Sequence, residues 1–159
     1  MKRLLILLCV LALLLSLPGG TAAAKPEEGT FTITSTATTY TPEIRPNGHV
    51  KFHMTAVGSV TGYFEGTFTF EEDGEVELLP PFLPGVPGKG KSEGIMTITT
   101  TTGQVVIKFH GKSEYLTTWG KFEVRHKDCT DEYEGLHGNG DYIGDAGFVF
   151  TVVFDGKFH

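Results

Sequence analysis

The sequence predicts an all-β protein, a single antiparallel closed barrel of about eight strands preceded by a signal peptide. Phe, Tyr, Thr, Val and Ile recur in runs of five to ten residues that alternate apolar with polar positions, as half-buried strands do. After the N-terminal segment, no stretch shows the i, i+3, i+4, i+7 apolar spacing of a helix. Because no helical layer is available to cover a sheet, the strands must bury their apolar faces against one another.

Residues 1–24 are predicted to be the signal peptide. Two basic residues precede a twelve-residue apolar run, which is shorter than the roughly 20 residues that cross a membrane. Small residues follow the run, and cleavage is expected between Ala24 and Lys25. The protein is therefore expected to be secreted, periplasmic or at the cell surface, without a stable membrane anchor, with one barrel domain over residues 25–159.

The first predicted strand covers residues 30–40, where apolar side chains alternate with threonines. Asn47-Gly48 is a turn pair that tolerates positive φ, and the alternation resumes from Val50 as a second strand. A third strand is predicted over residues 62–71. Asp73-Gly74 then predicts a tight hairpin turn that reverses the chain.

Prolines and glycines dominate residues 80–94, which are predicted to form a long irregular loop because proline cannot donate to a strand ladder. Strands resume at residues 95–102, turn at Gly103 and return through residues 105–109. A further strand is predicted at residues 121–126.

Residues 127–134 are acidic and lack apolar periodicity, which predicts a turn or a single helical turn. Five glycines follow within residues 135–147 and lead into a final strand at residues 148–154. This strand is apolar on both faces, so it is expected in the middle of a sheet or at a contact between subunits. A homo-oligomer is therefore one expectation.

The mature chain is acidic and has one cysteine. The leader holds two of the 13 basic residues and none of the 19 acidic ones, which leaves 11 against 19 and a net charge of −8. Such a surface repels nucleic acid and suits a soluble exported domain or a basic partner. Cys9 is removed with the leader, so Cys129 can form no internal disulfide. It remains a candidate for pairing between subunits, for a reactive thiol or, as the favoured reading, for a small buried residue.

The run from Gly135 to Phe148, with Gly138, Gly140, Gly144 and Gly147, resembles the closing segment of allene oxide cyclase-like and dirigent-like barrels. The similarity is greatest to their bacterial and archaeal relatives of unknown function. The resemblance implies a barrel with an apolar cavity, often dimeric or trimeric, in which some members guide cyclisation or radical coupling. Function does not follow from a shared fold, and no catalytic residue is carried over.

Polar residues form no established catalytic or metal motif. His49 and His53 share a strand face but stand about 13 Å apart at strand rise, too far to bind one metal together, and no metal or cofactor is predicted. The acidic residues between positions 128 and 145 depart from calcium-loop spacing and are expected to be solvated. No Gly-x-Ser-x-Gly elbow is present. Carboxylate pairs like those of glycoside hydrolases can be drawn from Glu65, Glu71, Glu114 and Glu123.

Three functions therefore stay open. The first is a secreted barrel that binds an apolar or aromatic small molecule in its interior. The second is an enzyme of the cyclase or isomerase kind in that interior, with Glu65, Tyr63 or His110 as candidates if they point inward. The third is a non-catalytic surface or structural protein.

Overall fold

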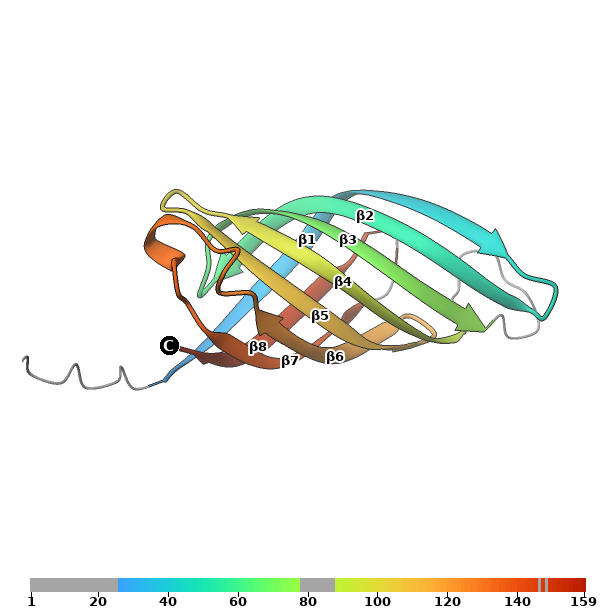
Figure 1. The fold of residues 1–159 in the computed structure, drawn as a ribbon. Coiled ribbons are helices and arrows are strands. Elements are labelled where there is room, and N and C mark those ends of the chain that lie inside the picture. The colour runs from blue at the N-terminus through green and yellow to red at the C-terminus, as the bar shows by residue number, and fades with distance from the viewer. Residues whose placement is uncertain (1–25, 78–87, 146, 148) are drawn as a thin grey trace, which may run out of the picture.

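The computed structural model describes residues 26–77, 88–145, 147 and 149–159, and it is a closed barrel of antiparallel strands (Figure 1). The fold prediction is confirmed. The elements are β1 (Glu27–Ile44), β2 (His49–Gly62), β3 (Gly66–Glu77), β4 (Lys89–Thr99), β5 (Gln104–Glu114), β6 (Thr117–Val124), the short 3-10 helix η1 (Asp131–Tyr133), β7 (Gly138–Asp145) and β8 (Thr151–Phe158).

Each strand pairs with its neighbours in the sequence, and β1 pairs with β8 to close the wall. The start of β1 and the end of β8 lie at the same end of the barrel, where Glu27 is opposite Phe158 (Figure 1). The strand that is apolar on both faces is thus paired on both sides, by β7 and β1, as the sequence predicted. It begins at Thr151, later than predicted, and continues to Phe158.

We call the end where β1 begins and β8 finishes the closed end. The ring of Phe31 stacks on that of Phe154 with 4.7 Å between centroids. Phe64, from the β2–β3 connection, inserts between Phe31 and Phe158 at centroid distances of 5.2 and 5.3 Å. Tyr133 of η1 packs on Phe64 at 5.8 Å from outside. Aromatic rings therefore fill and cap this half of the barrel.

The predicted hairpin turn at Asp73-Gly74 is wrong, because β3 runs straight through both residues to Glu77. Gly74 faces inward, and the ring of Phe52 on β2 occupies the space that a side chain at this position would need. Asp73 faces outward, where its Oδ1 lies 3.0 Å from His53 Nδ1. A ring from the neighbouring strand thus takes the place of the missing side chain and keeps the strand extended.

Several other boundaries differ from the sequence predictions. β1 extends beyond Tyr40 to Ile44 and includes Pro42. Beyond Thr34, the ladder joins β1 to β2 but no longer to β8, so this part of β1 is an edge strand. A proline is tolerated there because its missing N–H can face away from the paired strand. β4 begins at Lys89, inside the region predicted as loop, while residues 78–87 of that loop lie outside the described residues.

Residues 127–134 were predicted to form a turn or a single helical turn, and the structure shows the second of these as η1. The predicted leader, with its cleavage point between Ala24 and Lys25, lies outside the described residues. Among the residues that are described, no helix has the length and apolarity to cross a bilayer.

Ser35 secures the closure between β1 and β8. Its side chain is buried, and its Oγ accepts a hydrogen bond from the Phe150 N–H at 2.8 Å. The Ser35 N–H in turn donates to the Phe150 carbonyl at 3.0 Å. This pair of bonds continues the wall past a β-bulge between Ser35 and Ala37, where the β1–β2 register shifts.

Candidate functional site

The other half of the barrel, which we call the open half, keeps inward-facing side chains in contact with solvent. Strand alternation from buried Val50 and Ala56 places Phe52 and Met54 of β2 inward, yet both are only partly buried. Cross-strand pairing places Tyr40 opposite Met54, and Tyr40 is also partly exposed. Among the described residues, these partly exposed side chains contrast with the inward-facing rings of the closed end, which are almost fully buried.

A carboxylate lies at the boundary between the two halves. Glu72 of β3 faces inward opposite Met54 of β2 and Gly94 of β4. One cross-strand row deeper, Phe70 and Met96 belong to the buried core. Glu72 therefore stands where the dry aromatic interior gives way to the solvent-accessible part.

Four polar side chains gather around this boundary, and we call them the inner polar cluster: Tyr40, Glu72, Ser92 and Tyr142. Burial raises the pKa of Glu72 to about 7, with a smaller upward contribution from the charge of Asp73 and a partly offsetting hydrogen bond from Ser92. Burial, and then the charge of Glu72, raise the pKa of Tyr40 and bring that of Tyr142 to about 12. The four groups thus share one electrostatic environment.

No basic side chain neutralises this cluster from within the described strands. The inward-facing positions of β1 to β8 hold no Lys, Arg or His, because the basic residues of these strands occupy the outward-facing positions. Glu72 is also the one carboxylate among the described inward-facing residues of β2 to β8. An unneutralised acid in a partly dry interior is costly to keep ionised, which explains the direction of its pKa shift.

Tyr142 contributes a buried hydroxyl to the cluster. The residue is 6% exposed, and no group among the described residues meets strict hydrogen-bond geometry with Oη. Thr118 lies close enough to act on Oη as a hydrogen-bonding group, which lowers the tyrosine pKa and partly offsets the effect of burial. The hydroxyl lies over Gly111, where any side chain would collide with it. An unsatisfied buried hydroxyl is unfavourable, so it is available to a ligand that supplies a hydrogen bond.

Aromatic rings surround the cluster. The rings of Tyr40 and Phe52 lie 5.4 Å apart, and those of Phe109 and Tyr142 lie 6.1 Å apart in an edge-to-face arrangement. Phe109 lies over Gly94 as Phe52 lies over Gly74. The cluster is thus set in apolar walls, which is the usual composition of a small-molecule site.

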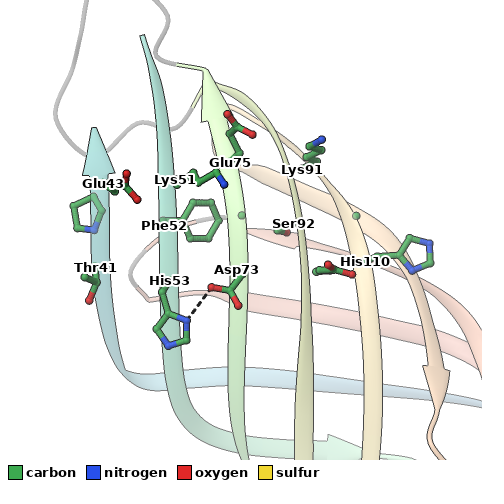
Figure 2. Close-up of a pocket in the computed structure, with 14 residues that line it drawn as sticks. Thr41, Glu43, Lys51, Phe52, His53, Asp73, Glu75, Lys91, Ser92 and His110 are labelled. Atoms are coloured by element: carbon green, nitrogen blue, oxygen red, sulfur yellow. Dashed lines mark hydrogen bonds and ion pairs between the residues drawn. The ribbon is translucent and has the colours of Figure 1, made fainter. Parts of the chain in front are cut away.

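A shallow groove of about 880 Å³ crosses the outer face of β1 to β5 (Figure 2). One cross-strand row, which includes Gly74 and Gly111, forms its floor. Outward-facing charged side chains flank this row on both sides. His53 and Asp73 pair with each other at 3.0 Å, and Glu93 pairs at 3.7 Å with Lys108, which lies beside the groove. Exposed pairs of this kind bind ligands weakly, and the groove is a poorer candidate than the interior.

The residues proposed from sequence as candidates for chemistry do not meet. Glu65 is exposed in the β2–β3 connection, and His110 points outward into the groove of Figure 2. Tyr63 stacks on Phe158 at the closed end, with 4.5 Å between ring centroids. Sequence reasoning missed Glu72 because the neighbouring Asp73-Gly74 pair was interpreted as a turn. The period-two series through Phe68, Phe70, Glu72, Gly74 and Val76 was the signal that places it inward.

The remaining candidates have structural settings. His126, His137 and His159 stack in series, with centroid distances of 4.2 and 5.7 Å, and across the described residues no three His, Cys, Asp or Glu side chains are placed to hold a metal ion. Cys129 is buried; its Sγ accepts from the Val106 N–H at 3.4 Å and donates to the Arg125 carbonyl at 3.6 Å. The thiol thus ties the segment after β6 to β5.

Neither a protein-family model nor a curated protein sequence matches the chain.

Proposed function

We propose that the protein is a secreted β-barrel that binds an apolar or aromatic small molecule in the open half of its interior. The observation that carries the proposal is the solvent access of inward-facing Tyr40, Phe52 and Met54, in contrast to the buried rings of the closed end. Large apolar side chains that line an accessible interior gain free energy when a ligand covers them. The resemblance to allene oxide cyclase-like and dirigent-like barrels, which implies an apolar cavity, supports the same proposal.

The test is a titration of the purified protein with the neutral apolar fluorophore N-phenyl-1-naphthylamine. We expect saturable binding in the micromolar range. Ser92→Leu places bulk in the open half and should weaken binding about tenfold or more, since it removes volume that the ligand needs. Lys91→Leu, on the outward-facing neighbour, is the matched control and should bind as the unchanged protein does. Absence of saturable binding, or equal binding by a folded Ser92→Leu variant, would contradict the proposal.

An enzyme acting in the same interior is the second candidate, and Glu72 is the observation that favours it. A carboxyl group with a pKa of about 7 exchanges protons readily near neutral pH, as a general acid or base must. The role would fall to Glu72 and Tyr142 rather than to Glu65, Tyr63 or His110. Recovery of every bound ligand unchanged after long incubation would argue against this candidate.

The outer face of β6 to β8 favours self-association. Trp119, Ile143 and Val153 are successive cross-strand neighbours, and all three are exposed apolar side chains. A row of this kind suits a contact between copies of the chain. Sedimentation at micromolar concentration should show a species larger than the monomer, and Ile143→Lys should dissociate it. A strict monomer would exclude this contact.

A further inference from the structure

We infer that the open half of the barrel selects ligands that join an apolar or aromatic body to a protonated amine, with the Glu72 carboxylate as counter-ion. The inference rests on the proposed function, because it names the ligand class for the same interior. Three features of the inner polar cluster carry it.

The first feature is the charge of the interior. Glu72 is the one inward-facing carboxylate described on β2 to β8, and no Lys, Arg or His side chain faces inward from the described strands. A ligand amine would supply the positive charge that the protein does not. A ligand carboxylate would meet Glu72 with like charge, so acidic apolar molecules are disfavoured. The net charge of −8 after removal of the predicted leader also attracts cations toward the barrel.

The second feature is the set of hydrogen-bond acceptors. A protonated primary amine donates up to three hydrogen bonds. The Glu72 carboxylate accepts charge-assisted bonds, and Tyr142 Oη lacks a hydrogen-bond partner within the described residues. Both tyrosine and carboxylate therefore gain partners from the same ammonium group.

The third feature is the ring of aromatic side chains. Tyr40 and Phe52 lie beside each other at 5.4 Å, and cross-strand pairing puts Tyr40 and Glu72 on either side of Met54. The negatively polarised faces of such rings attract an ammonium group, while the same rings and Met54 pack against an apolar body. A neutral apolar ligand would use only the second of these contacts.

The groups facing Glu72 give the inference a pH signature. They are Tyr40 from β1, uncharged Met54 from β2, Ser92 from β4 and Tyr142 from β7, with Asp73 outward on β3 itself. A cation binds the ionised form of Glu72, so binding should release a proton from the carboxyl near pH 7 and should strengthen as the pH rises toward 8.

The experiment compares three probes with one ring system: 2-naphthylmethylamine, 2-naphthylmethanol and 2-naphthoate. At pH 8 the amine should bind the native protein about tenfold more tightly than the alcohol, because it adds a charge-assisted bond, and the acid should bind most weakly. Calorimetry in two buffers of different ionisation enthalpy should show proton release when the amine binds at pH 7.

Two variants complete the test. Glu72→Gln should abolish the preference for the amine and retain affinity for the alcohol, whereas Glu71→Gln, the outward-facing neighbour, should keep the preference. Equal affinities of the native protein for amine and alcohol, or a preference that survives Glu72→Gln, would overturn the inference and leave the proposed function standing. Failure of all three probes to bind would overturn both.

Discussion

Replacing Glu72 by glutamine is expected to raise the free energy of unfolding at pH 8 by about 2 to 3 kcal/mol and to leave it nearly unchanged at pH 4. Burial raises the pKa of Glu72 from 4.5 to about 7 in the folded protein, so the folded state binds a proton that the unfolded state has lost. Each pKa unit corresponds to about 1.4 kcal/mol, reduced here because the side chain keeps some access to solvent. The contribution of Glu72 to the free energy of unfolding is therefore fully present below pH 4.5 and is lost as the pH rises through about 7.

Urea denaturation of the native protein and the variant at pH 4, 6 and 8 measures this effect. The two stability curves should coincide at pH 4 and diverge as the pH rises, since the glutamine amide cannot ionise. Glu71→Gln is the control, because it makes the same chemical change on the outer face of the same strand, and its curve should follow that of the native protein. Parallel curves for native and Glu72→Gln would contradict an inward-facing, partly desolvated carboxyl.

Replacing Gly140 by alanine is expected to destabilise the barrel by about 3 kcal/mol. A methyl group at this position of β7 would collide with the Asp155 carbonyl of β8, and it would lie 2.6 Å from Gly156 Cα and 2.7 Å from the Phe122 ring. The neighbouring backbone cannot move without breaking the β7–β8 ladder. Overpacking lowers the free energy of unfolding by roughly 1 to 3 kcal/mol when only side chains must adjust. Because backbone atoms are involved here, we expect a loss at the upper end of this range.

The midpoint of thermal or urea unfolding reports the effect, with far-UV circular dichroism as the check that the variant folds. Gly147→Ala is the matched control: among the described residues its methyl group would approach the Val149 carbonyl alone, at 3.3 Å, so a loss of stability below about 1 kcal/mol is expected. Equal stability of Gly140→Ala and the native protein would show that β7 and β8 can separate locally, contrary to the close approach seen here.

The sequence predicted those parts of the fold in which burial repeats every second residue. β8 is the clearest case. The alternation of Val152 and Phe154 correctly predicted the inward face. The apolar Val153 on the opposite face correctly predicted a strand within the sheet, with a neighbouring strand on each side. Closure followed from the lack of any helical layer. In these regions local composition and tertiary burial point to the same structure, and prediction succeeds.

The candidate site could not be predicted in the same way. Asp73-Gly74 has the composition of a tight turn, and nothing nearby in the sequence shows that Phe52 of another strand fills the space beside Gly74. The inward direction of Glu72 depends on that strand continuing. Phe64 is the opposite case. Its alternation with Gly66 and Phe68 predicted that it belongs to a strand, but it lies in the connection between β2 and β3 and packs into the closed end of the barrel. Both outcomes depend on rings that are distant in sequence.

The β1–β8 ladder has a consequence for how the chain acquires its shape. All other ladders join segments that follow one another, whereas Ser35 and Phe150, which meet at this seam, are 115 positions apart. The wall therefore cannot be completed until the last strand has been synthesised. Its first and last strands are partners in one sheet, so deleting either would leave an open trough with exposed edges instead of a shortened barrel.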